Sequence, residues 1–185
     1  MKLPNIIPEI CKKAEIFFDI QANSCNFADK QEFKDNMTEI LSHIGNLDLL
    51  KAKKTAFLCS SKTTSRDIMK SFDWAMSVPK DSCIISGFQT KLEQDVLHIL
   101  LKRHISVIIV LARRMYKTLP TEIQEAINQQ QVLILSLSNH PRNTKENALE
   151  RNKYIMEEAD EIVFGALDKS SSLYTLYTNR KENYS

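Results

Sequence analysis

The chain has 185 residues, a formal net charge of +2, 43% hydrophobic residues and 26% charged residues. These values are typical of one soluble globular domain with a sizeable core. Only 3 glycines are present, which excludes a glycine-rich phosphate cradle over most of the chain. Because the net charge is small, an anion-binding site has to be a local feature rather than a property of the whole surface.

The cysteines form no CxxC pair and do not cluster with histidine, so we expect buried, reduced thiols rather than a zinc site or a disulfide framework. We also expect no metal and no cofactor. The N-terminal residues lack the apolar core of a signal peptide. No run approaches the roughly 20 apolar residues needed to span a bilayer. We therefore expect a cytoplasmic protein without a membrane partner.

Residues 1–54 are predicted to form an N-terminal helical appendage, and residues 55–185 a separate α/β domain. A first helix is expected after Pro8, and a second over Gln31–Ile44, where apolar residues recur at helical spacing until Gly45. A short third piece is expected around Leu47–Leu50.

From residue 55 onward, short apolar strands alternate with segments of helical periodicity. The segment Ser82–Ala112 has the order strand, helix, strand within about 30 residues, which indicates a right-handed βαβ crossover. The pattern predicts a doubly wound, mostly parallel α/β sheet. The expected strands are Thr55–Cys59, Cys83–Ile85, Ile105–Leu111, Val132–Leu135 and Ile162–Phe164.

Two helix starts have capping residues. The sequence T-x-x-Q from Thr121 predicts a capping box, and Thr144 is expected to cap a helix that runs to about Glu158. This second helix places Asn152 on its apolar stripe, which is unfavourable for an unpaired amide. Asn152 either bonds a nearby loop carbonyl, or Arg151 and Asn152 together reach a pocket and hold a loop or ligand there.

Polar residues follow the expected strands at the edge where parallel strands end, which is where such sheets bind ligands. Hydroxyls, free amides at helix N-termini and a few cations at this edge predict an anion site of the phosphate type. The residues concerned are Ser60, Ser61, Lys62, Ser86, Gly87, Phe88, Gln89, Lys91, Arg113, Arg114, Ser170, Ser171 and Ser172.

Known catalytic motifs are absent: the chain has no GxSxG, HExxH, P-loop lysine or GxGxxG. His98 lies within an amphipathic helix and is expected to pack there. Glu93 lies in the first turn of the same helix, where the helix dipole favours a carboxylate. It is either a structural cap or, in an enzyme, the candidate catalytic residue.

Five short motifs occur in an order that resembles the Rossmann-like domain of the DNA-processing protein A (DprA/Smf) family, within the SLOG superfamily. The resemblance covers about residues 55–176. The motifs are SSK at 60–62, SGFQTKLE at 86–93, LARRMYKTLP at 111–120, RNKYI at 151–155 and SSSLYTL at 170–176.

The resemblance implies a bacterial-type module that binds single-stranded DNA or a nucleotide and, in that family, loads a recombinase. It assigns phosphate contacts to Lys62, Lys91 and Arg151, and base stacking to Phe88. Ser86, Gly87 and Ser170–Ser172 would supply hydroxyls and amides, with no catalysis. The chain departs from the family motifs where Ser60, Lys62, Lys91, Glu93 and Ser171 replace Gly, Arg, Gly, Asp and Gly. The family's next strand and helix are expected to be missing or very divergent.

Two other functions remain open. The first is a nucleotide-processing enzyme of the LOG phosphoribohydrolase type, with Glu93 and Arg151 as its only candidate pair, although the PGGxGT motif is absent. The second is a degenerate scaffold that acts through protein contacts of its N-terminal segment. A homodimer is open under each of these readings.

Overall fold

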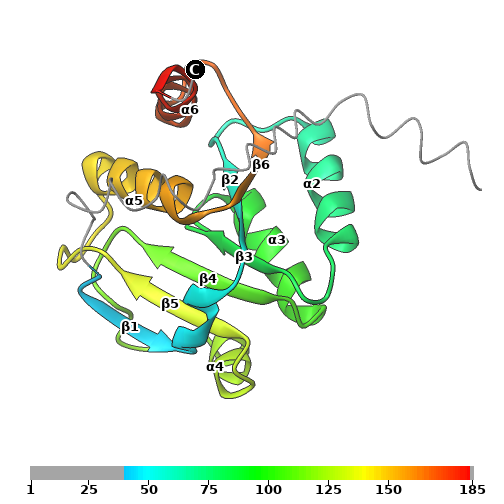
Figure 1. Ribbon diagram of the computed structural model, residues 1–185, viewed down its shortest axis with the longest axis vertical. Helices are drawn as coiled ribbons and strands as arrows, with labels where there is room; N and C mark the ends of the chain where they lie inside the picture. Colours follow the sequence, from blue (N-terminus) through cyan, green and yellow to red (C-terminus); the bar gives the residue numbers. More distant parts are fainter. Residues whose placement is uncertain (1–39, 184–185) are drawn as a thin grey trace, which may run out of the picture.

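The computed structural model describes residues 40–183 and shows one six-stranded sheet in the order β1-β5-β4-β3-β2-β6 (Figure 1). Strands β2 to β6 run parallel, and β1 pairs antiparallel with β5 at one end. The predicted mostly parallel α/β sheet is therefore confirmed. The strands are β1 (Ser42–Gly45), β2 (Lys54–Cys59), β3 (Cys83–Ser86), β4 (Ser106–Leu111), β5 (Val132–Ser136) and β6 (Glu161–Ala166).

Helices cover both faces of the sheet. Residues of α2, α3 and α4 share one hydrophobic core with the strands, and residues of α5 and α6 share a second core on the opposite face. A doubly wound sheet has helices packed on both of its faces. Its strands are therefore buried on both sides and apolar throughout. The helices are α2 (Ser65–Ser77), α3 (Lys91–Lys102), α4 (Thr121–Asn128), α5 (Lys145–Glu158) and α6 (Ser172–Asn183), with a short 3-10 helix η2 (Leu47–Lys51).

The crossover from β3 through α3 to β4 is the βαβ unit expected from Ser82–Ala112. Ile85 and Ile108 belong to one core, and Ile84 and Val107 to the other, so neighbouring residues of each strand face opposite layers. The five strands expected after residue 54 agree with β2 to β6 within one or two residues at each end.

The segment before residue 54 differs from the prediction. Ser42–Ile44 was expected at the end of a helix, but it forms the strand β1, paired with Leu133–Ser136. The chain turns sharply at Gly45, whose φ of 103° favours glycine and whose missing side chain lets it approach the backbone of Val132. The remainder of the predicted helix 31–44, and the helix predicted after Pro8, lie outside the described residues.

Residues 40–54 pack on the α/β body. Ile44 contacts one core, while Leu49 and Leu50 contact the other. The short element expected near Leu47–Leu50 is the 3-10 helix η2, capped by the side chain of Asn46. Within the described residues, this part of the predicted appendage thus belongs to the same sheet as the rest.

One predicted cap is wrong and another is confirmed. The helix α4 has Pro120 at its N-cap and no side-chain cap, so Thr121 is the first helical residue rather than the cap. Thr144 caps α5 and accepts a hydrogen bond from the Asn147 N–H. Among the described residues, no helix has the length and apolar character needed to cross a membrane.

Candidate functional site

The loops that follow the five parallel strands all lie at one edge of the sheet. This edge carries residues 60–64 after β2, 87–90 after β3, 112–120 after β4, 137–144 after β5 and 167–171 after β6. The predicted site residues therefore lie on one side of the molecule, as expected for parallel strands. Their side chains form three groups.

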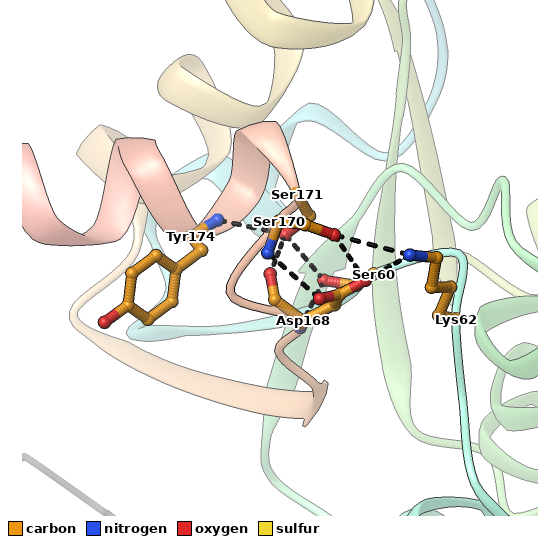
Figure 2. Close-up of polar contacts among 6 residues, drawn as sticks. All are labelled: Ser60, Lys62, Asp168, Ser170, Ser171 and Tyr174. Carbon is orange, nitrogen blue, oxygen red and sulfur yellow. Dashed lines mark hydrogen bonds and ion pairs between the residues drawn. The ribbon is translucent and has the colours of Figure 1, made fainter.

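The first group joins the loops after β2 and β6 (Figure 2). The hydroxyls of Ser60 and Ser171 lie 3.0 Å apart, and the Asp168 N–H donates to the Ser60 hydroxyl over 3.1 Å. The Ser171 hydroxyl donates to the Asp168 carbonyl. Ser60 is 4% exposed. Ser60 and Ser171 therefore lie close together, as the sequence predicted. Their hydroxyls form hydrogen bonds within this group rather than pointing to an open ligand site.

Lys62 reaches the same group from the loop after β2 (Figure 2). Its ammonium nitrogen lies 3.3 Å from the Asp168 carboxylate and 3.4 Å from the Ser170 hydroxyl. Ser170 also donates its N–H and its hydroxyl to that carboxylate, at 2.9 Å each. The Ser170 donors and Lys62 lower the pKa of Asp168. A carboxylate thus occupies the place where the sequence predicted a phosphate beside Lys62.

The second group surrounds the turn between β3 and α3. The Glu93 carboxylate, 3% exposed, accepts backbone N–H bonds from Cys59 at 3.0 Å, Gln89 at 2.8 Å and Thr90 at 2.9 Å. Burial raises the pKa of Glu93, while the Thr90 N–H, Arg151 and the other donors oppose that rise. Glu93 therefore fills the anion position at the start of α3 and acts as a structural cap.

The other residues of this turn that the sequence placed at the site are also hydrogen-bonded, buried or ion-paired within the protein. The Ser86 hydroxyl is buried and accepts the Phe88 N–H. Phe88 has a φ of 46°, and its ring is 5% exposed within the core, so no stacking surface is offered there. The Lys91 ammonium pairs with Asp95 at 2.7 Å.

Arg151 on α5 is the buried cation of this second group. Its Nε and Nη2 donate to the Asn152 side-chain oxygen at 3.1 and 2.9 Å, and a β-carbon at Gly87 would stand 2.5 Å from its guanidinium carbon. Burial lowers the pKa of Arg151, and the nearby charge of Glu93 opposes that shift. The predicted Arg151–Asn152 unit does reach the edge beside Gly87. Asn152 bonds Arg151 rather than a loop carbonyl.

The third group lies on the adjacent loops after β4 and β5. The Arg114 N–H donates to the His140 carbonyl at 2.8 Å, and the Ser136 hydroxyl donates to the Arg113 carbonyl at 2.9 Å. The Arg113 guanidinium carbon lies 4.4 Å from the centre of the Tyr116 ring. The Arg114–His140 bond joins the two loops, and the Ser136–Arg113 bond joins the end of β5 to the loop after β4.

The sequence prediction included Arg113 and Arg114 but missed the combined charge of these two loops. Residues 112–120 and 137–144 together contain four Lys or Arg side chains and no Asp or Glu, and Lys145 follows as the first residue of α5. Four of the five are exposed, and no ion pair involving them is seen within residues 40–183. Each loop is basic in the sequence, but α4 and β5 separate the two loops along the chain, so their charges do not stand together there. The five cations are Arg113, Arg114, Lys117, Arg142 and Lys145.

The loop after β5 also contacts the turn after β3. The Asn143 amide donates to the Gln89 side-chain oxygen at 2.7 Å, which links the third group to the second. Among the described residues, no cluster of His, Cys, Asp or Glu could hold a metal ion. Ser61 and Ser172 lie at the same edge, and both are exposed.

A parallel α/β sheet with a polar, partly basic C-terminal edge defines a Rossmann-like protein, a class in which ligands bind at that edge of the sheet. The family model for DNA recombination-mediator protein A matches residues 23–184. The chain belongs to this family, and the predicted DprA resemblance is confirmed.

Solved structures agree on the fold. DNA processing protein A from Streptococcus pneumoniae matches with a TM-score of 0.63 and 18% identity, over 76% of this chain and 50% of the other. The protein of that name from Helicobacter pylori, whose structure was described for its single-stranded DNA binding mode, matches with a TM-score of 0.60 and 21% identity, over 75% of this chain and 67% of the other. The chain thus spans about half the length of the S. pneumoniae protein. No curated protein matches the chain.

Proposed function

We propose that this chain binds single-stranded DNA across the C-terminal edge of its sheet, mainly over the loops after β4 and β5. The observation that carries the proposal is the set of four Lys and Arg side chains, without an acid, on these adjacent loops, with Lys145 beside them at the start of α5. Because the net charge of the whole chain is only +2, this positive charge is a local feature of the two loops. Membership of a DNA recombination-mediator family and the single-stranded DNA of the H. pylori relative support the choice of ligand.

The ion pairs along this edge favour the loops after β4 and β5, rather than those after β2 and β3, as the DNA contacts. Lys62 and Lys91 are held by Asp168 and Asp95, so each would have to leave an ion pair to neutralise a phosphate. Arg114 and Arg142 are exposed and have no such competitor among the described residues. Neutralising backbone phosphates and releasing their counterions supplies most non-specific affinity for nucleic acids.

The aromatic component of the proposed interface is Tyr116 rather than Phe88. The Arg113 guanidinium lies over the Tyr116 ring, and both side chains are half-buried. Arginine planes and aromatic rings are the surfaces on which single-stranded bases stack. Of the residues that the sequence placed at a phosphate-type site, Arg113 and Arg114 are the ones that this proposal retains as DNA contacts.

The proposal is tested with a fluorescently labelled single-stranded oligonucleotide and anisotropy at several salt concentrations. The double variant Arg114→Ala/Arg142→Ala should bind more weakly and lower the slope of log affinity against log salt by about 0.7 per lost phosphate contact. The matched control, Lys62→Ala/Lys91→Ala, removes two cations of the same edge and should leave the slope close to that of the unmodified chain.

Two results would overturn the proposal. One is affinity in the Arg114/Arg142 variant equal to that of the unmodified chain. The other is the absence of salt-dependent binding in the unmodified chain, which would favour a scaffold acting through protein contacts. A larger loss in the Lys62/Lys91 control would move the interface to the loops after β2 and β3.

A further inference from the structure

The last residue of β5, Ser136, is polar but only 1% exposed. Its hydroxyl donates to the Arg113 carbonyl at 2.9 Å and to the Ser138 carbonyl at 3.2 Å. A hydroxyl has one proton, so the two carbonyls share it. Arg113 belongs to the loop after β4 and Ser138 to the loop after β5, the two basic loops of the proposed DNA interface. Ser136 therefore holds one carbonyl of each basic loop.

Further hydrogen bonds lead from Ser138 back to the residue that follows Arg113. The Ser138 hydroxyl accepts the His140 N–H at 3.2 Å. The His140 carbonyl in turn accepts the Arg114 N–H at 2.8 Å. Because Arg113 and Arg114 are neighbours in the chain, these bonds close a ring through the two basic loops. Ser136 is the one buried residue of this ring.

The ring consists only of main-chain groups and hydroxyls, which carry no charge. No ion pair of Arg113 or Arg114 is seen within residues 40–183. Adjacent cations repel one another, and an acidic residue that held them together would also occupy them. The ring instead fixes the backbone that carries the two cations and leaves their guanidinium groups to a ligand.

We propose that Ser136 is a positioning residue of the DNA interface, which fixes the basic loops in the arrangement that binds single-stranded DNA. The inference rests on the proposed function. Because Ser136 is buried, it acts through the Arg113 and Ser138 carbonyls rather than by touching the DNA. A loop that is already held in its bound conformation loses less conformational entropy on binding, so the affinity is higher.

The test compares Ser136→Ala with the unmodified full chain in anisotropy titrations of a labelled oligothymidine at several salt concentrations. Ser136→Ala should weaken binding about fivefold, the factor that corresponds to one hydrogen bond of ordinary net strength. The slope of log affinity against log salt should not change, because the same number of cations still meets phosphates. Loss of a DNA-contacting arginine lowers that slope, so the two roles are distinguished.

The matched control is Gln131→Met at the other end of β5. Gln131 is 7% exposed, and its side-chain amide donates to the carbonyls of Leu101 at 3.3 Å and Ile105 at 2.8 Å. The variant thus removes buried hydrogen bonds of the same kind, away from the basic loops. It should lower the Tm and leave DNA affinity unchanged. Equal losses of affinity in the two variants would show that affinity follows general stability, and would overturn the inference.

A second measurement uses the free protein. Amide hydrogen exchange at Arg114, measured by NMR, reports how often the Arg114–His140 bond opens. Exchange should be faster in Ser136→Ala than in the unmodified chain, and unchanged in Gln131→Met. Equal exchange in Ser136→Ala and the unmodified chain would overturn the inference, because the ring would then hold without the hydroxyl.

The variant Ser136→Cys covers the case in which Ser136→Ala fails to fold, since it keeps a side chain of similar size with only a weak donor. It should show the same changes, smaller in size. Faster exchange at Arg114 with unchanged DNA affinity would overturn the inference and leave the proposed function standing. Absence of DNA binding by the unmodified chain would overturn both.

Discussion

The guanidinium of Arg151 lies against the α-carbon of Gly87, so that a β-carbon at position 87 would come within 2.5 Å of the guanidinium carbon. Arg151 cannot easily withdraw, because it is 6% exposed and two of its nitrogens are bonded to Asn152. This contact joins α5 to the turn that opens α3. The glycine is needed here for space rather than for an unusual backbone angle.

We expect Gly87→Ala to destabilise the protein by about 1 to 3 kcal/mol, the usual range for overpacking a buried site. The entropic gain of Gly→Ala, about 0.4 to 1 kcal/mol, is smaller and does not offset it. Urea unfolding measures the change. In an Arg151→Ala background the same substitution should cost much less, and an equal cost in both backgrounds would show that the contact does not set the requirement.

We expect Glu93→Gln to lower the free energy of unfolding by about 3 kcal/mol. The amide removes the charge that compensates buried Arg151, and its NH2 group cannot accept the N–H bonds that the second carboxylate oxygen receives. Chemical denaturation gives the value. The matched control is Asp95→Asn on the same helix, whose exposed pair with Lys91 should contribute under about 1 kcal/mol. Equal effects of the two substitutions would contradict a structural role for Glu93.

The Asp168 turn should respond to acid. Bonds from Ser170 and the charge of Lys62 lower the pKa of Asp168 below its ordinary value of 3.8, so its stabilising contribution is complete above that value. The contribution is lost as pH falls through the lowered pKa. NMR of the Ser170 amide during an acid titration should show its hydrogen bond released below about pH 4. In Asp168→Asn the transition should disappear, and its persistence would assign it to another group.

The two cysteines of the described core should be unreactive. Burial raises the pKa of Cys59 to about 12 and that of Cys83 to about 11, and for Cys59 the charge of Glu93 adds to the effect. Alkylation at pH 8, followed on the separate peptides by mass spectrometry, should be more than about a hundredfold slower than in the unfolded chain. Comparable rates in the two states would show that the native protein opens at these strands.

The sequence predicted the sheet well because its parallel strands are apolar on both faces and are bounded by polar turns. It did not predict β1, because Ser42–Gly45 is short, half-polar and preceded by apolar residues at helical spacing. The role of Glu93 as a cap was one of two predictions, and the structure supports it through Thr90 and Cys59. The basic loops were only partly recognised, since their charge becomes a single feature only when β4 and β5 lie side by side.

The position of Glu93 has a consequence for what the β3–α3 turn can recognise. Its carboxylate is tethered to the chain three residues from the cap Thr90, so it acts as an intramolecular competitor for every incoming anion. Tethered groups act at effective concentrations in the millimolar range or above. Free phosphate or a nucleotide at ordinary concentrations would have to displace a ligand that the protein always carries with it. The turn is therefore closed to weak anions by its own sequence.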